Sequence, residues 1–132
     1  MPTAAASPPA PRRRAAAPRP ELKLRMRVTL GDTNAIGPGK VALLEAVHEH
    51  HSISAAAKSL GMSYRRAWLL VDELNRALKS PAVTTAAGGA NGGGTALTEV
   101  GLRLVALYRD IEAQAQHHCR DDIAKLLALV AR

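Results

Sequence analysis

The fold of this chain depends most on one short stretch, residues 52–68, which reads SISAAAKSLGMSYRRAW. Ser52 or Ser54 can cap a short helix that continues through the three alanines Ala55–Ala57. Gly61 tolerates the left-handed backbone conformation that commonly ends a helix. The stretch therefore predicts two helices joined by a very tight turn, and the small alanine side chains let these helices cross closely.

A third helix should begin at Ser63, whose hydroxyl can cap its first turn. Its apolar residues recur at steps of three and four, as expected for one buried face: Ala67, Leu70, Val71, Leu74 and Leu78. The opposite, exposed side then carries Ser63, Tyr64, Arg65, Trp68 and Leu69 near the N-terminus of the helix.

Two elements are predicted before this stretch. Residues 22–30 alternate apolar and polar side chains strictly, which predicts a half-buried strand, and residues 31–34 should break it. A helix should then begin at Gly37–Pro38, because the N–H that proline lacks has no intrahelical partner at the first position. It should end near His51.

A hairpin and a long helix are predicted after it. Two short strands, residues 82–85 and 95–98, flank the glycine-rich loop 88–94. Thr98 can cap a long helix, with a break near Arg120–Asp121. The apolar face of that helix holds Val100, Leu104, Leu107, Tyr108, Ile111 and Ala115. The order predicts a mainly α fold with a small β-hairpin wing: a winged helix-turn-helix followed by a long dimerisation helix, with its third helix able to enter a DNA major groove.

Three segments are expected along the chain. Residues 1–21 hold most of the prolines together with Ala and Arg, which predicts a disordered basic arm. This arm is either a solvated leader or a transient contact to DNA phosphates. Residues 22–98 should form the winged helix-turn-helix, and residues 99–132 a C-terminal dimerisation helix or helix pair.

Charge and composition narrow the class of protein. The 132 residues allow one core, and 18 Lys and Arg against 11 Asp and Glu give a net charge of +7. This charge suits nucleic acid, and an acidic membrane surface would also fit. Cys119 is the single cysteine, which excludes an intramolecular disulfide. We expect a cytoplasmic protein, because no apolar run reaches membrane length and no secretory signal is visible.

Residues 24–108 resemble the N-terminal DNA-binding domain of the molybdate-responsive regulators of the ModE family. The resemblance rests on Ser52-Ile53-Ser54, Ala56-Ala57-Lys58, Ser63-Tyr64-Arg65, Ala67-Trp68, Asp72, Asn75, the glycines of 88–94, Leu97-Thr98-Glu99 and Gly101. More distantly, the layout is similar to the LysR-type regulators. The resemblance implies that the helix from Ser63 is the recognition helix, that residues 88–94 are the wing, and that the helix 99–118 dimerises. The chain departs from the family at His51, where glycine is common.

The residues expected to contact double-stranded DNA are Ser52, Ser54, Lys58, Ser63, Tyr64, Arg65, Arg66, Trp68, Asn91, Gly92 and Gly93. Arg65 suits guanine or a phosphate, and Arg66 a flanking contact. Tyr64 and Ser63 suit phosphates or base edges. Trp68 suits a sugar or a thymine methyl group, or else packs against a neighbouring element. The wing has no cation at Ala90, so its contacts would use Asn91 or backbone N–H groups.

The expected assembly is a homodimer on a pseudo-palindromic operator, formed through Val100, Leu104, Leu107, Tyr108 and Ile111. Regulators of the ModE family usually carry C-terminal oxyanion-binding domains, whereas this sequence ends at Arg132. Direct molybdate sensing and a cofactor are therefore not expected. A constitutive DNA binder, a separate sensor protein and another signal remain open.

Other functions are less well supported by the sequence. His48, His50, His51, His117, His118 and Cys119 suggest a metal site, but the helix dipole favours histidines at helix C-termini, so none is predicted. The glycine loop lacks the Gly-Lys-Ser/Thr of a phosphate-binding loop, and no catalytic cluster is visible, so the protein should not be an enzyme. A winged helix used for protein contact and a sequence-indifferent nucleoid-type DNA binder remain alternatives.

Overall fold

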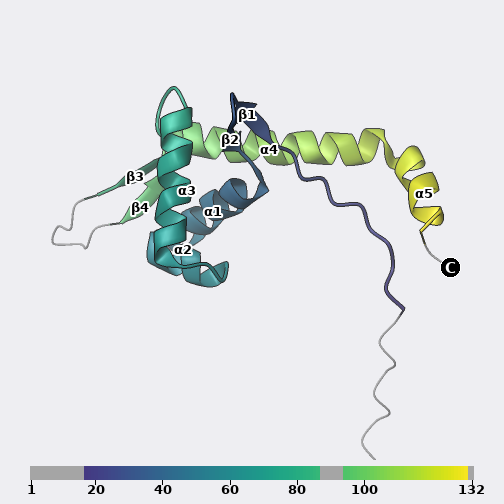
Figure 1. Cartoon of the computed structure of the whole chain (residues 1–132), viewed down its shortest axis with the longest axis horizontal. Helices are drawn as coiled ribbons and strands as arrows, with labels where there is room; N and C mark the ends of the chain where they lie inside the picture. The colour runs from purple at the N-terminus through teal and green to yellow at the C-terminus, as the bar shows by residue number, and fades with distance from the viewer. Residues whose placement is uncertain (1–16, 87–93, 131–132) are drawn as a thin grey trace, which may run out of the picture. The chain divides into compact units, whose positions relative to one another are not determined.

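The computed structural model describes residues 17–86 and 94–130. Residues 24–118 form one compact unit (Figure 1). Its elements in chain order are β1 (Val28–Leu30), β2 (Thr33–Ile36), α1 (Pro38–His50), α2 (Ile53–Ser59), α3 (Tyr64–Ala77), β3 (Val83–Thr85), β4 (Thr95–Leu97) and α4 (Glu99–His118). The fold class predicted from the sequence is confirmed: the unit is mainly helical, with a small two-stranded hairpin after the third helix.

The remaining described residues belong to a second unit, which contains α5 (Arg120–Ala128). The predicted break near Arg120 is confirmed, because α4 ends at His118 and α5 begins two residues later. None of the residues of α5 is buried. In the described parts of the chain, we find no helix that combines the length and the apolar character needed to cross a bilayer.

The core of the larger unit is aliphatic, as a sequence without phenylalanine requires. Its largest fully buried side chains are Val41, Leu43, Leu44 and Val47 of α1 and Leu74 of α3. The alanines Ala56, Ala57 and Ala67 are also buried, so that α2 and α3 approach each other over side chains that end at Cβ. This close crossing is the one predicted from residues 52–68.

The turn between α2 and α3 follows the sequence signals closely. Gly61 has a φ of +67°, and its N–H donates to the carbonyl of Lys58 at 3.2 Å. The N–H of Met62 donates to the carbonyl of Ala57 at 3.0 Å, which completes a Schellman motif at the end of α2. The hydroxyls of Ser52 and Ser63 cap α2 and α3 by accepting backbone N–H groups three residues later. The predicted cap at Ser63 is confirmed, and of the two serines predicted as alternatives for α2, Ser52 is the cap.

The predicted strand over residues 22–30 is wrong in its extent. Only Val28–Leu30 pairs, and its antiparallel partner is β2, which lies where the sequence was expected only to break the strand. Leu24 and Met26 are half-buried and Arg25 is exposed. The alternation of apolar and polar residues therefore reflects an extended segment with one face partly buried. A period of two needs only an extended backbone with one covered face, whereas a strand needs a hydrogen-bonded neighbour.

A two-residue turn made the β1–β2 hairpin possible. Gly31 has a φ of +60°, and Gly-Asp is a favoured hairpin pair, a signal that could have predicted β2. The hairpin is held to the helices by Lys40, which is buried. Its ammonium group donates to the carbonyl oxygen of Asn34 and forms an ion pair with Glu73 of α3 at 3.2 Å.

Helix α4 packs against the rest of the unit, so the expected boundary at residue 98 falls inside it. Arg109 donates from Nε to a carboxylate oxygen of Glu45 in α1 at 3.1 Å and from Nη1 to Glu112 at 2.6 Å. Hydrogen bonds to Glu45 and then to Glu112 raise the pKa of the Arg109 guanidinium above its usual range. The hydroxyl of Tyr108 donates to the carbonyl of Met26 at 2.9 Å.

The start of α4 lies unusually close to β3. The hydroxyl of Thr98 caps α4 by accepting the N–H of Gly101 at 3.1 Å, as predicted, and the N–H of Thr98 donates to the carbonyl of Ala82 at 2.9 Å. A Cβ atom added at Gly101 would lie 2.3 Å from that same carbonyl oxygen. Glycine is therefore required there for close approach.

We predict that Gly101→Ala lowers the free energy of unfolding by about 1–3 kcal/mol, because backbone must move to admit the methyl group. Gly39→Ala is the matched control, since an added Cβ there meets nothing within 4 Å and the site is helical. It should be neutral or stabilising by up to about 1 kcal/mol. Urea unfolding of both variants measures the difference, and equal stability of Gly101→Ala and the parent would contradict the packing described.

Candidate nucleic-acid interface

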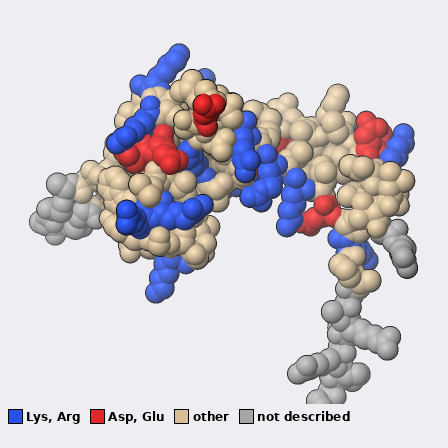
Figure 2. All heavy atoms as spheres, viewed as in Figure 1, with Lys and Arg blue, Asp and Glu red and all other residues tan. Residues whose placement is uncertain are grey.

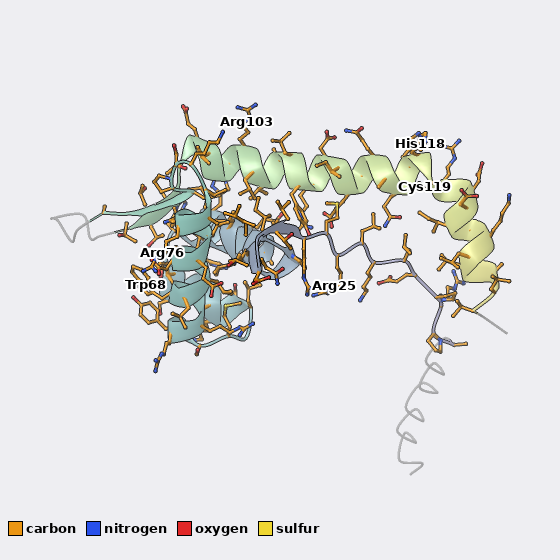
Figure 3. All side chains as sticks on the ribbon, turned by 45° about the horizontal axis from the view of Figure 1, so that its top comes forward. Arg25, Trp68, Arg76, Arg103, His118 and Cys119 are labelled. Atoms are coloured by element: carbon orange, nitrogen blue, oxygen red, sulfur yellow. The ribbon has the colours of Figure 1, made fainter. Side chains whose placement is uncertain are left out.

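The N-terminal end of α3 presents large side chains to solvent. Tyr64, Trp68 and Leu69 are 55%, 41% and 54% exposed. Ser63 and Arg65 are also exposed, as the apolar spacing of α3 predicted, and Arg66 is exposed as well. In Figure 3, Trp68 lies nearer than Arg76 to the end of α3 that adjoins α2. This end of the helix is therefore available to a partner.

Tyr64 and Trp68 form a pair on this surface, which we call the aromatic pair. They lie one helical turn apart, and the indole Nε1–H of Trp68 donates to the hydroxyl oxygen of Tyr64 at 2.8 Å. The indole nitrogen is a donor only, so this bond uses the whole hydrogen-bonding capacity of Trp68. The Tyr64 hydroxyl keeps its own hydrogen to donate elsewhere.

Two guanidinium groups lie at the same helix end. Within residues 17–86 and 94–130, neither Arg65 nor Arg66 forms an ion pair. Both belong to the first turn of α3, where the helix dipole disfavours cations, and that turn holds no acidic residue. Figure 2 shows cationic side chains around this end of α3, with carboxylates toward its other half. An anion at this end would relieve the unfavourable field.

An open pocket of about 310 Å³ adjoins the aromatic pair. Its lining comes from the start of α2, the start of α3 and the base of the hairpin: His51, Ser52, Ile53, Ser54, Tyr64, Trp68, Thr85 and Thr95. The pocket thus combines aromatic and aliphatic surface with hydroxyl groups. The sequence predicted Ser52, Ser54, Tyr64 and Trp68 as contacts, but it gave no reason to select Ile53, Thr85 or Thr95.

The hairpin is fixed beside this pocket by Asn75. The Oδ1 atom of Asn75 accepts the N–H of Ala82 at 2.8 Å and the N–H of Val83 at 3.3 Å, and its Nδ2 donates to the carbonyl of Val83 at 3.1 Å. At the other strand, the N–H of Thr95 donates to the carbonyl of His51 at 3.0 Å. These bonds orient the hairpin base with respect to α2 and α3.

The wing contacts predicted from the sequence, Asn91, Gly92 and Gly93, lie outside the described residues.

The turn before α2 has a left-handed backbone. His51, the position at which the family commonly has glycine, has a φ of +55°. The left-handed turn that glycine favours is thus made here by histidine, and Ser52 follows it as the cap of α2. Lys58 is exposed on α2.

Comparison with known proteins identifies the class of this domain. Residues 39–102 match the family model described as bacterial regulatory helix-turn-helix protein, lysR family. The chain is 40% identical over 92 residues to the molybdenum transport protein ModE of Azotobacter vinelandii, and 45% identical over 102 residues to the molybdenum-pterin-binding protein MopB of Rhodobacter capsulatus. Residues 39–102 are therefore similar to a helix-turn-helix domain of the lysR family, and the chain is similar to the ModE proteins.

The matches involve most of this chain but only part of each relative. They cover 70% and 76% of the chain, against 34% and 35% of the Azotobacter and Rhodobacter proteins. The DNA-binding transcriptional dual regulator ModE of Escherichia coli K12 is 37% identical over 103 residues, which are 72% of this chain and 39% of that protein. The chain spans little more than a third of the length of these relatives.

In this ModE-like domain, the residues expected on the dimer seam divide into two groups. Val100, Leu107 and Ile111 are exposed on α4. Leu104 packs partly against the hydrophobic core, and Tyr108 is buried with its hydroxyl bonded to Met26. Tyr108 therefore contacts its own protomer and is not free to join the dimer seam, because the extended segment before β1 packs on its side of α4. The exposed seam is Val100, Leu107 and Ile111, with Leu104 at its edge.

The histidines and Cys119 are the residues whose chemistry would suit a metal site. Among the residues for which the structure gives positions, no three His, Cys, Asp or Glu side chains are grouped so that they could hold a metal ion. His48 and His51 instead make an edge-on ring contact with centroids 6.4 Å apart.

We predict that Asn75→Ala lowers the free energy of unfolding by about 1–3 kcal/mol, since it leaves two N–H groups and one carbonyl without their partner. Asn34→Ala removes an exposed amide and should change stability by less than about 0.5 kcal/mol. Urea unfolding of the two variants makes the comparison. Equal midpoints would show that the hairpin does not depend on Asn75.

Proposed function

We propose that this protein is a transcriptional regulator that binds double-stranded DNA through the N-terminal end of α3. The observation that carries the proposal is the position of two guanidinium groups, Arg65 and Arg66, beside exposed aromatic rings at one end of a lysR-type helix-turn-helix. Among the described residues, neither guanidinium has an ion-pair partner. Such a helix end fits a DNA major groove, where arginine can bind guanine in a bidentate manner. The Escherichia coli relative is named as a DNA-binding transcriptional dual regulator, which agrees with this role.

The charge distribution supports DNA over an uncharged partner. Arg65 and Arg66 lie where the helix dipole disfavours them, so bound phosphate improves their electrostatic environment. Ser52, Ser54 and Lys58 of α2 provide further contacts to the sugar-phosphate backbone, which position the helix without reading sequence. Asn75 holds the base of the hairpin beside α3. The proposed contacts also include Asn91, Gly92 and Gly93 of the glycine-rich loop.

The proposed assembly is a homodimer in which α4 of each copy pairs through Val100, Leu107 and Ile111. Two-fold symmetry then presents two recognition helices to half-sites of a pseudo-palindrome in successive major grooves. Arg109 joins α4 to α1 through Glu45, and the proposed dimer seam and DNA-reading end belong to the same compact unit.

The physiological setting of the regulator is also a proposal. Relatives are named for molybdenum transport and molybdenum-pterin binding, which makes genes for molybdenum use the first place to search for operators. Such a regulator acts in the bacterial cytoplasm, where the chromosome lies. A signal can reach it from a separate sensor protein, and we assign no effector-binding residue in the described domain.

We predict that Arg65→Ala weakens binding to a specific operator by about 1–3 kcal/mol and binding to random DNA by much less, because arginine reads bases as well as phosphates. Arg76→Ala removes the same charge from the other end of α3 and should have little effect on either DNA. Fluorescence anisotropy with both duplexes measures the losses. Equal losses of Arg65→Ala on specific and random DNA would contradict the base-reading role.

We predict that Leu107→Glu dissociates the dimer, since the seam would have to bury two unpaired carboxylates. Leu102→Glu is the matched control, because Leu102 is also exposed on α4 but lies about 140° around the helix from Leu107. Sedimentation at micromolar concentration should give a dimer for the parent and for Leu102→Glu, and a 13.9 kDa monomer for Leu107→Glu. A monomeric parent protein would refute the proposed assembly.

A further inference from the structure

Resting on the proposed function, we infer that Trp68 reads the 5-methyl group of a thymine in the operator. The end of α3 proposed to face DNA carries an unusual amount of exposed aromatic surface. Large aromatic side chains are ordinarily mostly buried, whereas Tyr64 and Trp68 are half exposed there beside two arginines. A helix end built only to bind phosphate would not need apolar surface.

The hydrogen bond within the aromatic pair determines what Trp68 can offer. Its Nε1–H already donates to Tyr64 at 2.8 Å, and indole has no acceptor. Trp68 therefore presents apolar ring surface and no free polar atom to a base edge. In the major groove, the apolar group on a base edge is the 5-methyl of thymine, since the other distinguishing groups are donors and acceptors.

The pocket beside the pair fits this group. Ile53 and the two rings contribute apolar surface to its lining, and the hydroxyl-bearing residues Ser54 and Thr85 line it as well. The 5-methyl group projects from the base edge close to the sugar-phosphate backbone of its own strand. An apolar wall bordered by hydroxyl donors can thus hold the methyl group against Trp68 while the hydroxyls approach the adjacent phosphate.

The direct test removes the methyl group alone. Thymines of an operator enriched from random duplexes are replaced one at a time by deoxyuridine, which keeps the base-pairing groups unchanged. For the parent protein, at least one replacement in each half-site should weaken binding about fourfold, the factor expected from the free energy of burying one group of CH₂ size. Losses below twofold at every thymine would overturn the inference.

Two variants test whether Trp68 is the residue that senses the replacement of thymine by deoxyuridine. Trp68→Ala should bind more weakly and bind the thymine and deoxyuridine operators equally. Leu69→Ala removes a comparably exposed apolar side chain from the adjacent position and should keep the fourfold difference. Retention of the difference by Trp68→Ala, or its loss in Leu69→Ala alone, would overturn the assignment. Thermal unfolding of both variants confirms that each is folded.

The outcomes separate this inference from the proposed function. Failure to enrich any operator would contradict the proposed function, and the inference would fall with it. An enriched operator whose binding is indifferent to deoxyuridine would leave the proposed function intact and overturn the thymine contact alone. Unchanged DNA affinity of Trp68→Ala would also overturn it, and would favour a protein as the partner of the aromatic pair.

Discussion

The close crossing of α2 and α3 is the constraint on which the rest of the site depends. Ala56, Ala57 and Ala67 are buried at this crossing, and none of them has side-chain atoms beyond Cβ. Larger residues would push the helices apart, and overpacking in a filled core costs about 1–3 kcal/mol. The same crossing lets the first turns of α3 protrude with Tyr64 and Arg65 exposed, and it forms two walls of the adjoining pocket.

A frame of specific contacts fixes this surface in the free domain. Asn75 bonds the start of β3 to α3, Gly101 admits the carbonyl of Ala82, and Arg109 joins α4 to α1. The Asn75 contact joins consecutive elements, whereas the Arg109 contact joins elements 64 residues apart in the sequence. Because these bonds exist before any partner arrives, the reading end of α3 and the α4 seam are oriented in advance, which lowers the entropic cost of binding.

Sequence reasoning succeeded where the signal is local. The serine caps at 52 and 63, the left-handed Gly61 and the apolar spacing of α3 each act within a few residues, and the helices begin and end as they predict. It failed where the outcome depends on distant partners. The alternation of residues 22–30 could not show that the carbonyl of Met26 accepts a hydrogen bond from Tyr108, which lies 82 residues later, in place of a neighbouring strand. The role of Asn75 at the hairpin was also missed, because a single asparagine between two elements has no distinctive pattern.

Selection of bound sites from a pool of random duplexes, using the whole chain, tests the central claim most directly. Because the claim requires two recognition helices related by two-fold symmetry, the enriched sequences should be inverted repeats with half-sites about one helical turn apart. Their affinity should exceed that for random DNA at every salt concentration tested. A pool that stays random after selection, with equal affinity for all duplexes, would contradict the claim that α3 reads sequence.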